Sequence, residues 1–267
     1  MTTEEFREAG YRLIDLIADY RANLENLPVM ARTSPGEVRS SLPAAPPDEP
    51  DSFESILADL HQKILPGLTN WQSPNFFGYF PSNGLLSSVL GDYASTGLGV
   101  LGLSWQSSPA LTELEEVMTD WVRQMVGLPP DFQGVIQDTA STSTLIALLC
   151  ARERASGYSL AHGGLQAEPA PLVVYTSAQS HSSVDKAALL AGFGRENVRV
   201  VKSDEKYAMS AGDLAHCIDH DVKNGGKPCA VVATTGTTAT TALDPLDAVA
   251  SIAKQHGIWM HVDAAMA

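Results

Sequence analysis

The chain has 267 residues, of which 44% are hydrophobic and 18% charged, enough apolar material for one large hydrophobic core or two modest ones. This composition excludes a disordered chain. The formal net charge at pH 7 is −14, and the acidic residues are spread along the chain instead of forming a tail. Such a distribution argues against nucleic acid and against an anionic membrane as the main partner.

The cysteines and the N-terminus bear on where the protein works. Cys150, Cys217 and Cys229 lie far apart, are odd in number and lack the spacing of metal ligands, so neither a disulfide framework nor a metal site is expected. The N-terminus lacks the basic and then apolar run of a signal peptide, and no apolar stretch is long enough to cross a bilayer. We expect a soluble, unprocessed, cytoplasmic protein.

Two helical patterns joined by a polar arm open the chain. The first lies in residues 3–20, where apolar residues recur at helical spacing among charged ones, and the second covers 53–64. Between them, residues 33–52 are rich in proline and serine, which breaks regular structure. Residues 1–80 are therefore expected to form a helical arm whose apolar faces pack on something else, with a partner subunit as one candidate.

The middle of the chain has the composition of loops. Residues 74–108 are full of glycine, serine and aromatic residues, which favours irregular structure there. A strong helical pattern follows over 110–125.

Beyond Gly127 the sequence alternates between short β-rich runs and helical runs. This alternation is typical of parallel βαβ units in a sheet covered on both faces, so residues 81–267 are expected to form a large α/β domain. In such a sheet, ligands lie beyond the carboxyl ends of the strands. The expected strands are 171–177, 198–203, 228–236 and 258–265, and the expected helices are 144–155, 181–193, 213–224 and 246–256.

Three polar segments lie at the positions where that rule places a ligand. Residues 138–144 form a hydroxyl-rich turn that opens a helix, where free backbone N–H groups favour a phosphate; ordinary N-capping is the alternative. His181, after the first strand, could stack on a flat heteroaromatic ring or move protons, or it could cap the next helix. Asp263 ends the last strand, where a carboxylate can hold a pyridinium or a ribose; capping of a helix is the alternative. A buried acid without a partner at this position would be costly.

Together the three segments fit one ligand, a flat ring with a phosphate at one end and a basic nitrogen at the other. Pyridoxal phosphate has this shape, and it works as an electron sink when a carboxylate keeps its ring nitrogen protonated. Such a buried ion pair persists only if both partners are present. The sequence therefore indicates a pyridoxal-phosphate site at the carboxyl edge of the expected sheet.

Six segments, in order and with their spacing kept, connect the chain with a family. They are FFGYFPSNG, LSWQSSPALTELE, GVIQDTASTSTLIALLCARERA, SHSSVDKAALLAGFG, AVVATTGTTATTALDPL and WMHVDAAMA. The chain resembles the aromatic-amino-acid decarboxylases among the group II pyridoxal-phosphate-dependent decarboxylases, from its first helix to its last residue. The resemblance implies the α/β fold of the type I pyridoxal-phosphate-dependent transferases: a mainly parallel sheet flanked by helices, with an N-terminal helical arm. The C-terminal part of that fold is absent from this chain.

The resemblance also implies cofactor-binding roles. Asp263 matches the acid that binds the ring nitrogen, and His181 matches a histidine that stacks on one face of the ring near the substrate carboxylate; these two are the implied catalytic residues. Ala265 packs the other face, Thr238 lies near the phenolic oxygen, and the loop 139–141 contributes to the phosphate site. The implied cofactor-binding residues are Thr139, Ala140, Ser141, His181, Thr238, Asp263 and Ala265.

A second group of matching residues is implied to line the substrate pocket. Leu101 and Leu103, with Trp105, match a stretch that reaches the neighbouring subunit's pocket. Leu103 stands where the animal enzymes carry phenylalanine, and Ser82 where the family often has threonine. The implied pocket residues are Trp71, Tyr79, Phe80, Pro81, Ser82, Leu101 and Leu103.

The implied reaction is the decarboxylation of an aromatic L-amino acid such as DOPA, tyrosine or tryptophan to its amine and carbon dioxide, in a homodimer. The family's Schiff-base lysine lies some tens of residues beyond the strand that matches 258–265, and no lysine of this chain matches it. We therefore expect this polypeptide alone to bind the cofactor noncovalently at best and to be inactive, as part of a longer enzyme or as a truncation. No metal is implied.

Two alternatives remain open. The chain could serve other fold-type-I chemistry, either decarboxylation of an acidic or diamino acid or oxidative decarboxylation to an aldehyde. It could otherwise be a non-catalytic dimerising or regulatory fragment, because a helical arm supports association in active and inactive proteins alike.

Overall fold

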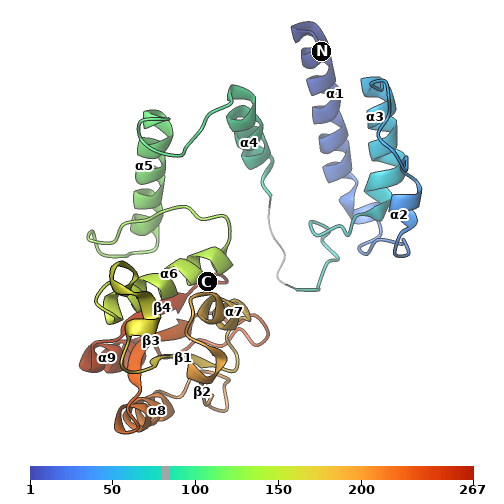
Figure 1. The fold of residues 1–267 in the computed structure, drawn as a ribbon. Helices are drawn as coiled ribbons and strands as arrows, with labels where there is room; N and C mark the ends of the chain where they lie inside the picture. The colour runs from blue at the N-terminus through green and yellow to red at the C-terminus, as the bar shows by residue number, and fades with distance from the viewer. Residues whose placement is uncertain (80–83) are drawn as a thin grey trace. The chain divides into compact units, whose positions relative to one another are not determined.

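The computed structural model describes residues 1–79 and 84–267, which divide into two units, Met1–Val100 and Leu101–Ala267 (Figure 1). In the first unit, α1, Thr3–Ala22, begins with a capping box. Thr2 Oγ1 accepts from the backbone N–H of Glu5, and the Glu5 carboxylate accepts from the N–H of Thr2, so two otherwise unpaired donors of the first turn are satisfied. A 3-10 turn, Leu24–Asn26, follows the helix.

The second helical pattern of the first unit forms three consecutive helical segments. α3, Phe53–Asp59, begins at Ser52, whose hydroxyl accepts from Ser55 N. It continues through a π-helical turn, Leu60–Ile64, into a 3-10 turn, Leu65–Gly67. Pro66 lies in that last turn and cannot continue an α-helix, so the helical run ends at Gly67.

Polar contacts tie α1 to the α3 segment. The Tyr20 hydroxyl donates to Asn70 Oδ1 over 2.5 Å, and the Arg12 guanidinium pairs with the Glu54 carboxylate. The Asn70 amide also donates to the carbonyl of Pro28 over 2.7 Å. The predicted helices over 3–20 and 53–64 are confirmed, and polar contacts connect them within this unit.

Two further helices of the first unit lie where loops were expected. α2, Glu37–Ser40, interrupts the polar arm, and α4, Leu86–Leu98, occupies the middle of the segment 74–108. The prediction of irregular structure is therefore wrong for 86–98. Two glycines inside α4 interrupt the helical spacing of its apolar residues, so its composition resembles that of a loop. A third glycine, Gly99, ends the helix with a left-handed φ of 62°.

The second unit is built on one four-stranded sheet whose strands are all parallel. The strand order is β2-β1-β3-β4, with Val174 opposite Val198, Tyr175 opposite Val231, and Thr234 opposite Asp263. Each strand is shorter than the run predicted for it, most clearly β2 and β4. The strands are β1, Leu172–Ser177; β2, Val198–Val201; β3, Lys227–Thr234; and β4, Trp259–Asp263.

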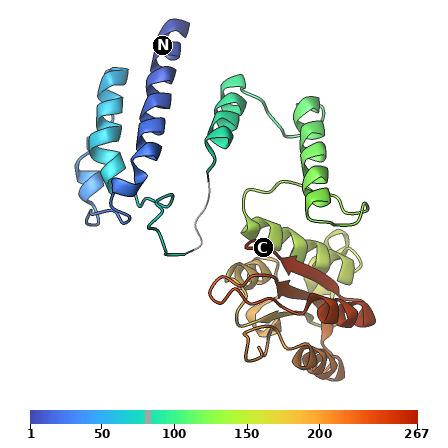
Figure 2. The same ribbon diagram turned by 180° about the vertical axis from the view of Figure 1, so that it is seen from behind.

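Helices cover both faces of this sheet. Figures 1 and 2 show α6 and α7 on one face, with α8 and α9 on the other, so the predicted α/β class with a parallel sheet flanked by helices is confirmed. The helices of the second unit are α5, Pro109–Met125; α6, Ala140–Ala155; α7, Ser183–Leu190; α8, Ala211–Lys223; and α9, Leu246–His256. Among the described residues, no helix is long and apolar enough to cross a membrane.

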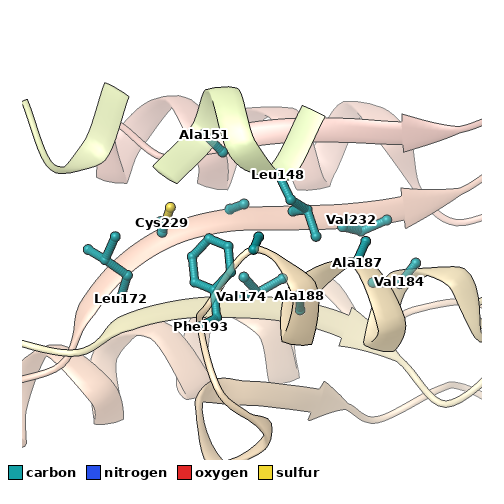
Figure 3. Packing of buried hydrophobic residues seen from close by; sticks show 12 residues of the cluster. Leu148, Ala151, Leu172, Val174, Val184, Ala187, Ala188, Phe193, Cys229 and Val232 are labelled. Carbon is teal, nitrogen blue, oxygen red and sulfur yellow. The ribbon is translucent and has the colours of Figure 1, made fainter. Parts of the chain in front are cut away.

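Each face of the sheet has its own hydrophobic core. Figure 3 shows the core under α6 and α7, where Leu148, Val184 and Ala188 meet Val174 and Val232 of the strands. On the other face, alternate strand residues pack against α8 and α9; this second core includes Val173, Tyr175, Val231, Leu214, Ile218 and Val249. All six residues of β1 are buried, as expected for a parallel strand covered on both sides.

A buried polar network fixes α8 to the sheet. Asp221 is 4% exposed; it accepts from the Tyr175 hydroxyl at 3.0 Å and from Arg199 Nε and Nη2 at 2.9 Å and 2.7 Å. Burial, and then the neighbouring Asp221 carboxylate, raise the pKa of Tyr175 above its ordinary value, so the phenol remains a donor. The carboxylate is therefore well satisfied although it lies in the interior.

Replacing Asp221 by asparagine should destabilise the full-length protein by about 2 to 3 kcal/mol, because it removes the charged acceptor that binds both the Tyr175 hydroxyl and the Arg199 guanidinium. Urea denaturation followed by circular dichroism measures the loss. Asp219→Asn is the control, since Asp219 is exposed on the same helix. Equal stability of the two variants would show that the network is not a stabilising element.

Candidate active site

The carboxyl ends of β1, β3 and β4 meet at one edge of the sheet. The N–H of Thr235, after β3, donates to the carbonyl of Asp263, the last residue of β4, over 2.9 Å. The Ser180 hydroxyl, after β1, accepts from the Thr176 hydroxyl at 2.7 Å and lies 3.5 Å from Thr234 Oγ1. Hydrogen bonds thus join all three strand ends, and we call this place the carboxyl edge.

Asp263 is the buried acid of the carboxyl edge. It is 8% exposed, and the N–H of Ala265 donates to its Oδ1 over 3.2 Å. A carboxylate can accept about four hydrogen bonds. Among the described residues, the N–H of Ala265 is the one donor to the Asp263 carboxylate. The geometry therefore leaves room for a cationic donor, which a buried carboxylate requires to offset its desolvation.

The N-terminus of α6 points to the same edge. Thr144, near the start of α6, lies 3.3 Å from His261 Nε2, whereas Arg154, near its end, lies over the Trp259 ring at 5.9 Å from the centroid. Since β4 runs from Trp259 to Asp263, α6 runs antiparallel to β4. Its first turn is thus at the end of the strand that carries Asp263.

The first turn of α6 has the form that the sequence predicts. Thr139 is the N-cap, and its hydroxyl accepts from Thr142 N at 3.2 Å. In the described residues, no hydrogen bond uses the N–H groups of Ala140 and Ser141, so both can face an anion. A hydrogen bond from Thr142 holds the pKa of the exposed Asp138 below its ordinary value; a phosphate here would share the helix terminus with a carboxylate.

His181 lies between β1 and α7 and is exposed. Its Nδ1 accepts from the N–H of Ser183 at 3.2 Å and is 2.9 Å from Ser183 Oγ. Because that backbone group can only donate, a neutral His181 carries its hydrogen on Nε2. The ring therefore offers an N–H donor on the side away from α7.

The loop after β3 contains Thr238 and folds back on itself. Thr238 is exposed, and the N–H groups of Gly236 and Thr237 both donate to the carbonyl of Ala242 at 3.0 Å. Gly236 adopts a φ of 85°, which favours glycine. This turn holds Thr238 at the carboxyl edge, although the described hydrogen bonds link it to neither His181 nor Asp263.

Asp244, which our sequence analysis missed, anchors that loop. It is 4% exposed, and its two carboxylate oxygens accept from Thr234 N and Met209 N, each at 2.7 Å. The sequence signal was available in the dipeptide Asp244-Pro245, an acid inside an otherwise apolar run. His261 was also missed, although strand alternation places it on the same face as Asp263.

The implied substrate-pocket residues fall into different units. In the first unit, Trp71 stacks on Phe76, with ring centroids 4.8 Å apart, and on Tyr79 at 5.6 Å. In the second unit, Leu101 and Leu103 are 64% and 81% exposed and precede α5. The proposed grouping of these residues in one pocket therefore stays a prediction. The remaining three, Phe80, Pro81 and Ser82, lie outside the described residues.

The polar groups of the carboxyl edge fit the cofactor that the sequence indicated. A buried carboxylate with spare acceptor capacity, a helix N-terminus with free N–H groups and an imidazole N–H all lie at the carboxyl edge, and they fit a ring with a cationic nitrogen and a phosphate. Among the described residues, no group of three or more His, Cys, Asp or Glu side chains is placed to hold a metal ion.

Comparison with known proteins agrees with this fit. Residues 35–267 match the family model described as the pyridoxal-dependent decarboxylase conserved domain, so the fold is that of the pyridoxal-dependent decarboxylases. The chain belongs to the pyridoxal-dependent decarboxylase family.

Individual relatives cover the whole chain. It is 42% identical to tryptophan decarboxylase 2 of Oryza sativa subsp. japonica over 275 residues, which cover 100% of this chain and 54% of that relative. It is also 42% identical to phenylacetaldehyde synthase of Arabidopsis thaliana over 275 residues, which cover 100% of this chain and 55% of that relative. The crystal structure of Catharanthus roseus tryptophan decarboxylase in complex with L-tryptophan superposes with a TM-score of 0.92 at 39% identity, covering 99% of this chain and 57% of that one. The chain thus spans about half the length of the relatives it matches.

Asp244→Ala should destabilise the full-length protein by about 2 to 4 kcal/mol, because it leaves two interior N–H groups without an acceptor. Urea denaturation measures the effect, with the exposed Asp247→Ala on α9 as the control. If both variants unfold at the same urea concentration, Asp244 does not anchor the loop.

Proposed function

We propose that the protein to which this chain belongs uses pyridoxal phosphate to decarboxylate an aromatic L-amino acid, giving the amine and carbon dioxide. The observation that carries the proposal is the convergence of Asp263 and the N-terminus of α6 at one edge of a parallel sheet. The identity of 42% with a tryptophan decarboxylase supports the choice of reaction and of substrate class.

Each cofactor-binding residue has a proposed task. Asp263 holds the proton on the ring nitrogen, since its carboxylate is buried and has acceptor capacity to spare. The backbone of 139–141 binds the phosphate at the start of α6. His181 and Ala265 cover the two faces of the ring, and Thr238 lies near the phenolic oxygen. When bound, the cofactor would supply an electron sink for the bonding pair that stays on the substrate α-carbon as carbon dioxide departs.

Orientation of the substrate is the other task of the protein. The bond to the departing carboxylate must stand perpendicular to the cofactor ring for the electron sink to act, and a fixed carboxylate contact achieves this. The Nε2–H of His181 is the proposed donor for that contact, because its Nδ1 is already occupied by Ser183. The proposed pocket is lined by Trp71, Tyr79, Phe80, Pro81, Ser82, Leu101 and Leu103.

The assembly and location are also part of the proposal. We infer a cytoplasmic homodimer, in which residues 1–80 form the dimerisation arm and 81–267 the front of the cofactor domain. The free state of Cys150, Cys217 and Cys229 supports a reducing compartment. We place the Schiff-base lysine outside residues 1–267.

Aldehyde formation is the second candidate function. The chain is as similar to a phenylacetaldehyde synthase as to a tryptophan decarboxylase, at 42% identity in each case. Oxidative decarboxylation would use the same cofactor contacts and would require dissolved molecular oxygen as the two-electron oxidant, giving an aldehyde, ammonia and hydrogen peroxide beside carbon dioxide.

The test is product analysis with the full-length protein loaded with pyridoxal phosphate. Tyrosine, tryptophan, DOPA and phenylalanine are supplied in turn, and released carbon dioxide, amine, aldehyde and ammonia are measured. We expect carbon dioxide and amine in equal amounts. Aldehyde with ammonia would favour the second candidate, and no carbon dioxide from any aromatic amino acid would refute both.

Asp263→Asn should weaken pyridoxal-phosphate binding to the full-length apo-protein about 10- to 100-fold, because a charge-assisted hydrogen bond contributes about 1.5 to 3 kcal/mol. Quenching of tryptophan fluorescence during titration gives the dissociation constant. Asp247→Asn, an exposed change on α9, controls for loss of charge alone. Unchanged affinity in Asp263→Asn would remove Asp263 from the cofactor site.

A further inference from the structure

His261 and Thr144 join the two elements that the proposed function assigns to opposite ends of the cofactor. Thr144 is 2% exposed and belongs to the start of α6, just after the proposed phosphate turn. His261 is half-buried in β4 and precedes Asp263 by two residues, on the same face of the strand. Its Nε2 lies 3.3 Å from Thr144 Oγ1.

The direction of this hydrogen bond follows from counting hydrogens. The Thr144 hydroxyl has one hydrogen to donate. Its Oγ1 lies 3.0 Å from the carbonyl oxygen of Ala140, which can only accept. Thr144 therefore donates to Ala140 and accepts from His261, whose hydrogen must be on Nε2. Burial lowers the pKa of His261 below its ordinary value, and nearby Asp263 opposes this effect; the neutral ring suits the single-donor role.

We infer that His261 is a positioning residue that sets the distance between the phosphate turn of α6 and the Asp263 carboxylate. The inference rests on the proposed function and deepens it. His261 reaches Thr144, and Thr144 in turn holds the carbonyl of Ala140 in the phosphate turn. A continuous path of hydrogen bonds therefore runs from β4 to the first residue of α6.

The shape of the ligand makes this distance consequential. The ring nitrogen and the phosphate of pyridoxal phosphate are separated by a rigid aromatic ring and a short CH2–O arm, so the ligand can adjust only over a small range when the two ends of the site move. Two contacts to one such molecule add their free energies fully only when the site is preorganised to a matching spacing. The His261–Thr144 bond supplies that preorganisation without touching the cofactor.

Two pairs of variants of the full-length apo-protein test the inference. Thr144→Val keeps the shape of the side chain and removes the hydroxyl, whereas Thr144→Ser keeps the hydroxyl. His261→Leu removes the donor, whereas His261→Gln keeps an N–H donor near the Nε2 position. Dissociation constants are measured by fluorescence titration with pyridoxal phosphate and, separately, with pyridoxal, which has no phosphate.

The two ligands separate positioning from general stability. We expect Thr144→Val and His261→Leu to weaken pyridoxal-phosphate binding about five- to tenfold, as the loss of one hydrogen bond would, and to change pyridoxal binding by less than about twofold. Thr144→Ser and His261→Gln should bind both ligands nearly as the wild type does.

Three results would overturn the inference: unchanged affinity in Thr144→Val and His261→Leu, equal weakening for both ligands, or no rescue by the two conservative variants. Urea denaturation of each variant shows whether it is folded at the titration temperature. A wild-type protein that fails to bind pyridoxal phosphate would instead refute the proposed function, so the two failures are distinguishable.

Discussion

The parallel direction of β1, β3 and β4 is the constraint on which the second unit depends. Parallel strands bring their carboxyl ends to one edge, and each must be followed by a crossover that covers a face of the sheet. The two hydrophobic cores then hold α6 and α7 on one face and α8 and α9 on the other. The proposed cofactor-binding groups of this unit therefore lie together at the carboxyl edge, in the strand ends, the loops that follow them and the first turn of α6.

Three buried carboxylates of this unit show how surroundings decide the role of an acid. Asp221 is paired with Arg199 and Tyr175, and Asp244 accepts two backbone N–H groups at 2.7 Å. Both are satisfied within the chain and are structural. Asp263 is also buried but receives a single hydrogen bond from the described residues. Of the three, it is the acid that can still accept from a ligand.

Much of the fold could be predicted because local patterns determine it. The alternation of β-rich and helical runs indicated the parallel sheet, and the helix over 246–256 is confirmed at both ends. α4 was missed because its two internal glycines interrupt the apolar periodicity by which an amphipathic helix is recognised. The hydroxyl-rich turn was recognisable as a helix start, but its placement beside β4 depends on contacts between residues more than a hundred positions apart, such as Thr144 and His261. No local pattern encodes such packing.

The strand order has a consequence for how the sheet assembles. β1 and β2 are close along the chain, as are β3 and β4, whereas the pairing of β1 with β3 encloses both β2 and α8. The entropic cost of closing a loop rises with the length of the enclosed segment. The pairing of β1 with β3, which we call the β1–β3 seam, therefore has the highest loop-closure cost of the three strand pairings. The carboxyl edge straddles that seam: His181 follows β1, and Thr238 follows β3. The site is therefore assembled only when the two halves of the sheet have joined.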